Sequence, residues 1–435
     1  MLDTPSVKYR ILNHTAIAGI ILFALFGWTG LSLSSLGAAL LILTVVGSAP
    51  SFFHVLSRDA TGWLVAAAMV YLVVQYFLTS WLQPLASEPD PGALQDWFIL
   101  WLFPVVAWAL KEKSAGFVRF LFGLAAVGLL SPVAWYIQWA ELADFFGKRQ
   151  EYQISSVPMG LYAGLVVFGL VVFLDALVNT ARTKGRWVRV GAIGLWGLML
   201  ALALIVFVTT QSRGGWLAFS IASIFAVVLL LVMRGADILA MLRKHRIPLA
   251  LALGLVLVFL WFAHGVLEDR IVRESEVYQT LPTLDRESIP YTSVGRRMHM
   301  WIYGVEKWVE QPMFGWGMGA ARELLEEDPE LSRHPHFHNA YLQIGVELGL
   351  LGLMFYGGVV VLLLARLVRS FQVHGTPLDL LIFVFGAWVM ILSWGLIDTR
   401  FAQSDGRFLF LMLFGVTMAL GQGWVHVAKS VNGDA

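Results

Sequence analysis

Apolar stretches of about 20 residues follow one another along most of this chain. A helix rises about 1.5 Å per residue, so a stretch of this length can cross a hydrocarbon layer about 30 Å thick. The run from Val190 to Val208 carries no charge and lacks the two-residue alternation that the strands of a membrane barrel require. The sequence therefore predicts an all-α polytopic membrane protein, and its 58% of apolar residues agree with this class.

The apolar stretches predict about twelve transmembrane helices. An even number of spans places both ends of the chain on the same side of the membrane. The predicted spans are residues 14–30, 34–53, 62–82, 97–110, 117–138, 159–179, 190–209, 215–233, 249–266, 340–365, 380–397 and 408–427.

Basic residues in the short loops indicate the orientation of these spans. The loops rich in Lys and Arg all fall on the side that also holds Lys8, and the loops of the other side are poorer in base. Loops rich in Lys and Arg remain in the cytoplasm, so the other side faces away from it. The basic loops contain Lys111, Lys113 and Arg119; Arg182, Lys184, Arg186 and Arg189; Arg234, Arg243, Lys244 and Arg246; and Arg366 and Arg369.

Charge and cysteine content narrow the classes of partner. The formal net charge is +1, so nothing in the composition indicates a nucleic-acid partner. The chain has no cysteine, which excludes disulfides and thiolate metal sites. Membrane lipids, and molecules that reach the membrane surface, remain as partners.

One long charged segment, residues 267–340, interrupts the apolar pattern on the non-cytoplasmic side. A loop of this length is structured or functional. Apolar residues at three- and four-residue steps predict an amphipathic helix over 298–309, which Pro312 ends, and a second short helix near 320–327. We therefore divide the chain into transmembrane helices 1–9 (residues 1–266), a periplasmic loop domain (267–340) and transmembrane helices 10–12 (341–435).

Three arginines on the non-cytoplasmic side are candidates for binding an anion. Arg213 lies in a Gln-Ser-Arg-Gly-Gly turn between two spans, where it either anchors a helix end at the headgroups or contacts a phosphate that the glycines let approach. Arg296 and Arg297 stand at a helix N-terminus, against the macrodipole. They either form a solvated basic face or bind an anion there. Together with Arg213 they could hold a pyrophosphate without metal.

Three histidines stand within five residues directly before the tenth predicted span: His334, His336 and His338. His336 and His338 could ligate zinc, but no third ligand stands at a recognisable spacing, so we expect no metal. His338 could instead act as a general base, because a helix N-terminus capped by Asn339 favours the neutral imidazole. A hydrogen-bonded interfacial role remains open for each histidine. The glycine run at 315–319 follows a helix instead of a strand, so no dinucleotide cofactor is expected.

Four motifs occur in order between residues 211 and 360, and their succession resembles the O-antigen ligase and O-antigen polymerase superfamily. The first half of the chain resembles that superfamily only in being a set of apolar helices. The motifs are Gln211-Ser212-Arg213-Gly214-Gly215; Gly295-Arg296-Arg297 with Trp301; Gln311-Pro312-Met313-Phe314-Gly315-Trp316-Gly317; and His336-Phe337-His338-Asn339-Ala340-Tyr341-Leu342-Gln343 with Glu347-Leu348-Gly349.

The resemblance implies a glycosyltransferase of the GT-C type in the bacterial inner membrane, with its active site facing the periplasm. The donor would be a glycan linked to undecaprenyl diphosphate, and the acceptor of a ligase would be a sugar of the lipid A–core. We favour an O-antigen ligase, with an O-antigen polymerase as the alternative. Carried over to this chain, the resemblance makes His338 and Arg213 catalytic and assigns substrate binding to Arg296, Arg297, His336, Asn339 and Gln343.

Two other classes of protein compete with an enzyme. A transporter of the same lipid-linked glycan would need polar residues along a transmembrane path, whereas most ionisable groups here gather at one outer surface. A scaffold that only binds polysaccharide enzymes would tolerate replacement of His338 and Arg213. We therefore expect an enzyme that transfers the glycan with inversion and without a metal or cofactor. This expectation requires that His338 and Arg213 meet over one cavity.

Overall fold

The computed structural model describes residues 7–30, 32–82, 91–136, 148–234, 286–401 and 403–426. Within these ranges the chain is helical and contains no β-strand, which confirms the all-α prediction for them. The helices are α1 (Val7–Phe26), η1 (Gly27–Thr29), α2 (Ser32–Gly47), α3 (Ala49–Ser57), α4 (Ala60–Leu82), α5 (Pro91–Leu100), α6 (Phe103–Ala109), α7 (Ala115–Leu130), α8 (Val133–Tyr136), α9 (Ser156–Val172), α10 (Leu174–Arg182), α11 (Arg186–Thr209), α12 (Arg213–Arg234), η5 (Arg286–Ser288), α16 (Ser293–Glu310), α17 (Ala320–Glu327), α18 (Ala340–His374), α19 (Leu378–Trp394) and α20 (Ser404–Gly421).

Seven of the described helices are long and apolar enough to cross a membrane, and the number rises to nine if each of two bent helix pairs is one span. The pair α2 and α3 is bent by 83°, and the pair α9 and α10 by 47°. The shorter apolar helices α7 and α19 coincide with two more predicted spans. A multi-pass membrane protein is thereby confirmed. The span predicted at 249–266 lies outside the described residues, so a total of about twelve stays a prediction.

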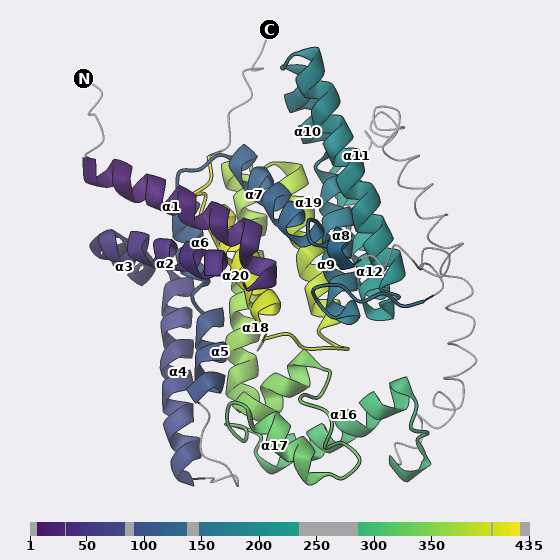
Figure 1. The fold of residues 1–435 in the computed structure, drawn as a ribbon. Helices are drawn as coiled ribbons and strands as arrows, with labels where there is room; N and C mark the ends of the chain where they lie inside the picture. Colours follow the sequence, from purple (N-terminus) through teal and green to yellow (C-terminus); the bar gives the residue numbers. More distant parts are fainter. Residues whose placement is uncertain are drawn as a thin grey trace.

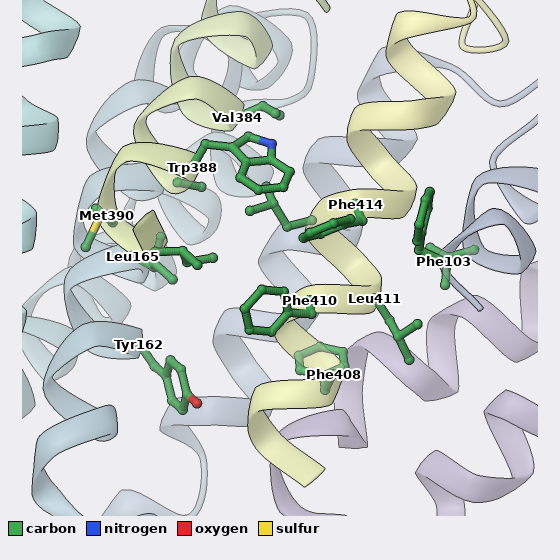
Figure 2. Close-up of a cluster of buried hydrophobic side chains, with 14 of the residues drawn as sticks. Phe103, Tyr162, Leu165, Val384, Trp388, Met390, Phe408, Phe410, Leu411 and Phe414 are labelled. Atoms are coloured by element: carbon green, nitrogen blue, oxygen red, sulfur yellow. The ribbon is translucent and has the colours of Figure 1, made fainter. Parts of the chain in front are cut away.

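Aromatic and aliphatic side chains fill the centre of the bundle, where α9, α19 and α20 meet (Figure 2). Trp388 of α19 packs against Phe414 of α20 with 4.6 Å between ring centroids, and its indole N–H donates to Thr417 at 3.0 Å. The hydroxyl of Tyr162 in α9 donates to Asp405 at the start of α20 at 2.9 Å. These contacts pack α19 along α20 and join α9 to the start of α20, next to the loop that follows α19.

Helices α16 and α17 form a second, smaller core at the opposite end of the bundle from the corner between α10 and α11 (Figure 1). Its fully buried side chains include Met300, Leu324 and Phe337, and the first turn of α18 adds Leu342. α16 covers the helix predicted at 298–309, and α17 spans residues 320–327 as predicted. Because α18 contributes to both cores, the small core is built directly on a membrane helix.

A break inside α18 explains the glycines of two sequence motifs, Gly315-Trp316-Gly317 and Glu347-Leu348-Gly349. Gly349 has φ 64° and ψ −167°, a conformation that interrupts the helix and that only glycine adopts readily. The backbone groups freed by this break pair with the chain after α16. The N–H of Trp316 donates to the carbonyl of Val346 at 2.8 Å, and the N–H of Leu350 donates to that of Pro312 at 2.8 Å. The glycine-rich run after Pro312 is therefore a strap across the break in α18.

A buried carboxylate reinforces the same junction. Glu347 accepts a hydrogen bond of 2.8 Å from Trp97 Nε1 and another from the side-chain amide of Gln343. Backbone N–H groups at the start of α17 donate to it as well, so the carboxylate joins α5, α17 and α18. The side-chain oxygen of Gln343 accepts a hydrogen bond of 3.2 Å from the backbone N–H of Phe337. Gln343 thus has internal partners at both ends of its amide, and its assignment to substrate stays a prediction.

Replacement of Gly349 by alanine should destabilise the protein by about 2 kcal/mol or more, because a residue with a Cβ is strained at this φ. The added Cβ would also lie 2.3 Å from the carbonyl oxygen of Met313. Gly357, in the same helix with nothing within 4 Å of its Cβ position, supplies the matched control Gly357→Ala. Thermal unfolding in detergent measures both variants. Equal melting temperatures for the two would contradict the role of the break.

Candidate active site

The segment before α18 holds His338 through both of its neighbours. Phe337 is fully buried, and its carbonyl oxygen accepts a hydrogen bond of 3.0 Å from Trp301 Nε1. Asn339 caps α18, because its side-chain oxygen accepts from the N–H groups two and three residues later. The N–H of Ala340 donates to a carbonyl at the end of α19 at 2.7 Å. The predicted cap is thereby confirmed, and His338 lies where α16, α18 and α19 meet.

His338 pairs with a carboxylate that the sequence did not reveal. Its Nδ1 lies 3.1 Å from Oδ1 of Asp398, which comes from the loop between α19 and α20. An ionised carboxylate can only accept, so Nδ1 carries the proton and Nε2 remains free to accept one. Burial acts to raise the pKa of Asp398, but the hydrogen bond from His338 and its charge outweigh this and hold the pKa below its ordinary value.

His336 lies beside His338 and is neutral at physiological pH. The two ring centroids are 4.1 Å apart, and the backbone N–H of His338 donates to His336 Nδ1 at 3.2 Å. Burial, followed by the charge of His338, lowers the pKa of His336 to about 4. The same two causes lower the pKa of His334. His336 is therefore a hydrogen-bonding neighbour of the site and not a cation.

Backbone strain marks two of the predicted motifs. His338 has φ 50° and Gln211 has φ 47°, and Glu112 is the third non-glycine residue with positive φ in the described ranges. Such conformations cost free energy and persist where the surrounding contacts impose them, which is common at active sites. The two turns that carry His338 and Arg213 are therefore both held in unfavourable shapes by their surroundings.

The turn before α12 is packed tightly against α9. Arg213 is the first residue of α12, and the hydroxyl of Ser212 donates to a backbone oxygen of α9 at 2.9 Å. A Cβ on Gly215 would lie 2.8 Å from the carbonyl carbon of Gly160, so glycine is what lets the α9 and α12 backbones approach this closely. Arg213 is half-buried as a result.

The charges of the other predicted arginines, Arg213 and Arg296, act on Arg297. Burial lowers the pKa of the Arg297 guanidinium, and the carboxylate of Asp398 opposes this effect. The charges of three further arginines lower the pKa as well: Arg213, Arg149 and Arg296. Arg213 and Asp398 thus both lie within electrostatic range of Arg297. That the arginine-bearing turn and the histidine-bearing segment form one site stays a prediction, which these electrostatic contacts support.

Arg149, Asp398 and Arg400 extend the predicted set. Asp398 and Arg400 directly follow the predicted span 380–397, and ionisable residues at the exit of a span were the signal that could have marked this loop. Arg400 donates to Asp405 at 3.2 Å, which ties the loop to α20. Arg149 stands in a loop of mixed charge and carries no such signal. The fold places it, because the N–H of Gln150 donates to a carbonyl at the end of α11 at 2.9 Å.

The site also offers ligands for a metal ion. His336, His338 and Asp398 each provide one ligand atom, and these atoms lie within 4.8 Å of one another. Absence of metal was predicted because the sequence shows no third ligand at a recognisable spacing, and the fold supplies one in Asp398. Nδ1 of His336 and Nδ1 of His338 already take part in the hydrogen bonds described above, which leaves Nε2 of each ring as a candidate ligand atom. Absence of metal stays a prediction.

Comparison with known proteins shows which family this region is similar to. Residues 198–357 match the model of the family Wzy_C, O-antigen ligase. Over these residues the chain is similar to that family. Among curated proteins, the exopolysaccharide production protein ExoQ of Rhizobium meliloti (strain 1021) is 29% identical over 274 residues, which cover 60% of this chain and 56% of that protein. The chain thus spans a little over half the length of this relative. The resemblance seen in the motifs is confirmed over residues 198–357.

The depressed pKa of His336 makes stability depend on pH. Between about 6.5 and about 4 the unfolded chain binds a proton at His336 that the folded protein does not, so acidification through this window should lower the free energy of unfolding. The variant His336→Asn should remove up to about 3 kcal/mol of this loss. Unfolding in detergent over a pH series measures the free energy of unfolding of wild type and of His336→Asn. The variant His14→Asn, at an exposed histidine, is the control. An unchanged slope in His336→Asn would refute the assignment.

Proposed function

We propose that this protein is an O-antigen ligase that transfers a glycan from undecaprenyl diphosphate to a hydroxyl group of the lipid A–core. The similarity to the O-antigen ligase family supports the reaction class. The observation that carries the proposal is that Asp398, the partner of His338, and the arginines Arg213 and Arg296 all act electrostatically on Arg297. A base and a cationic cluster are the two elements that displacement of a diphosphate from a sugar requires.

In the proposed reaction, Nε2 of His338 takes the proton of the acceptor hydroxyl. The oxygen forms a bond to the anomeric carbon of the donor as the bond from that carbon to the diphosphate breaks, which inverts the anomeric centre. Asp398 holds the imidazole in the tautomer that leaves Nε2 free, and it stabilises the imidazolium that results. Arg213, Arg296 and Arg297 stabilise the charge that develops on the departing diphosphate.

The proposed chemistry needs no metal or cofactor. Undecaprenyl diphosphate is already a good leaving group, and guanidinium groups supply the positive charge that a divalent cation would otherwise bring. The site lies at the end of the bundle that carries α16 and α17, away from the basic corner between α10 and α11 (Figure 1). By the positive-inside rule this end faces the periplasm of a bacterial inner membrane. The lipid tail would lie among the helices.

The name of the curated relative favours one alternative. ExoQ is described as an exopolysaccharide production protein, so an enzyme that extends a glycan, as O-antigen polymerases do, is the second candidate. Mass analysis of products decides between the candidates. Purified protein receives undecaprenyl-diphosphate-linked glycan with either rough lipopolysaccharide or a second donor. Glycan joined to the lipid A–core supports the ligase, an extended glycan on undecaprenyl diphosphate supports the polymerase, and movement of the donor across a vesicle without a new bond supports a transporter.

Replacement of His338 or Arg213 by alanine should abolish glycan transfer. Loss of a general base lowers rates by about 10²–10⁴-fold, and Asp398→Asn should cause a similar loss because the tautomer is no longer held. Product formation by purified protein is measured alongside thermal unfolding, which should show folded variants. His14→Ala and Arg189→Ala, both exposed and outside the site, are matched controls that should keep full activity. Full activity in a site variant would remove that residue's role.

Excess chelator should leave the rate of transfer unchanged, because the proposed mechanism uses no metal. The measurement is product formation with and without EDTA, followed by addition of Zn²⁺, Mg²⁺ or Mn²⁺ to the chelated protein. Loss of activity on chelation and its recovery with one of these ions would reassign His336, His338 and Asp398 as a metal site.

A further inference from the structure

The loop between α19 and α20, which carries Asp398, is held from the α19 side by backbone hydrogen bonds. The N–H of Asp398 donates to the carbonyl of Trp394, the last residue of α19, at 3.2 Å. The carbonyl of Gly395 accepts from the N–H of Ala340, the first residue of α18, at 2.7 Å. These bonds place the start of the loop relative to α18, and the residues after Asp398 set its further course.

Asp405, in the first turn of α20, holds the other side of this loop through Arg400. Its Oδ2 accepts from Arg400 Nε at 3.2 Å and lies 3.1 Å from a terminal nitrogen of the same guanidinium. The hydroxyl of Tyr162 in α9 donates to the same oxygen at 2.9 Å. Asp405 and Tyr162 are both buried, so protein donors and not bulk water satisfy this carboxylate.

The backbone of the loop is packed against the same turn of α20. A Cβ on Gly406 would overlap the carbonyl oxygen of Arg400 and lie 2.7 Å from its Cβ, so only glycine admits the loop at this distance. The N–H of Gln403 donates to that carbonyl at 3.3 Å. Arg400 is therefore fixed both at its backbone and at its side chain, shortly after Asp398 in the chain.

The position of Asp398 matters to the proposed reaction as much as its charge does. Its Oδ1 lies 3.1 Å from Nδ1 of His338, near the upper end of the range for a hydrogen bond. A displacement of about 1 Å in an active site can lower a rate about 100-fold. The charges of Asp398 and Arg400 both act on His336, so Arg400 is also held within electrostatic range of the histidines.

We propose that Asp405 is a positioning residue of the glycan transfer: by binding Arg400, it sets the loop so that Oδ1 of Asp398 stays at Nδ1 of His338. The inference rests on the proposed function and gives a part in it to a residue that acts through Asp398. A buried ion pair adds little net stability over apolar side chains of similar volume, because both charges lose their water. The fixed geometry of the loop is what this pair contributes, and Tyr162 supports it from α9.

The variant Asp405→Asn keeps the shape of the side chain and removes its charge. Rates of product formation should show kcat lowered by about 10- to 100-fold with KM for donor and acceptor within about twofold, because the base is displaced and substrate binding is not. Tyr162→Phe removes one hydrogen bond to Asp405 and should lower kcat by a smaller factor, which keeps the test valid if Asp405→Asn does not fold. An unchanged kcat in the folded variants would overturn the proposal.

The matched control is Asp379→Asn at the other end of α19. It breaks the ion pair of 2.7 Å with Arg119 in α7 and should keep the kcat of wild type. A loss in Asp379→Asn equal to that in Asp405→Asn would assign the effect to any broken ion pair of the bundle and overturn the proposal.

A double-variant cycle separates positioning of Asp398 from a general structural role. In Asp398→Asn the carboxylate that Asp405 positions is already lost. Addition of Asp405→Asn to Asp398→Asn should therefore lower kcat by no more than about twofold further. Losses that multiply would show that Asp405 acts on something other than Asp398 and would contradict the proposal.

The pairing of His338 with Asp398 can also be observed without turnover. In protein that carries isotope-labelled histidine, a ring proton bonded to a carboxylate gives a downfield NMR signal, which His338→Ala identifies by its loss. This signal should weaken or vanish in Asp405→Asn and persist in Asp379→Asn. An unchanged signal in Asp405→Asn would end the proposal. Wild type that shows the signal and forms no glycan product would instead count against the proposed function.

Discussion

The hydrogen bond between His338 and Asp398 is the contact on which the arrangement of this site depends. A carboxylate that is 5% exposed can stay ionised only if donors surround it, and here an imidazole N–H and the backbone N–H of Thr399 supply them. The bond joins the start of α18 to the loop after α19, which are separated by 60 residues of sequence. Most other features of this end of the bundle serve to hold these two segments at the required distance.

The outer helices act as part of that support. α16 donates a hydrogen bond from Trp301 to the residue before His338, and it also carries Arg296 and Arg297. The strap after Pro312 and the buried carboxylate of Glu347 fasten α16 and α17 to α18 at the break in that helix. A shift of α16 relative to α18 would therefore move Arg296 and Arg297 and also disturb the segment that holds His338. The candidate site thus draws residues both from the membrane helices and from α16.

Hydropathy and helical periodicity predicted much of this architecture, because the length of an apolar stretch and the spacing of apolar residues are local properties. The outer helices α16 and α17 and the cap at Asn339 were correctly placed for this reason. The bends between α2 and α3 and between α9 and α10 were not predicted, because they arise where one apolar run packs in two directions.

The candidate site was predicted in part. Arg213, Arg296, Arg297 and His338 stood out because charged or imidazole side chains at the mouths of apolar helices are unusual. Asp398 was missed because its partnership with His338 exists only in three dimensions, and Arg149 was missed because a charged loop looks the same whether or not it faces a site. The break at Gly349 had no local signal beyond the glycine itself.

The arginines around Arg297 have a consequence for turnover. Guanidinium groups repel one another, and the carboxylate of Asp398 attracts Arg297. An anion bound beside Arg297 would reduce the repulsion between these guanidinium groups. Under the proposed function, exchange of one lipid diphosphate for another would keep an anion beside these arginines throughout turnover.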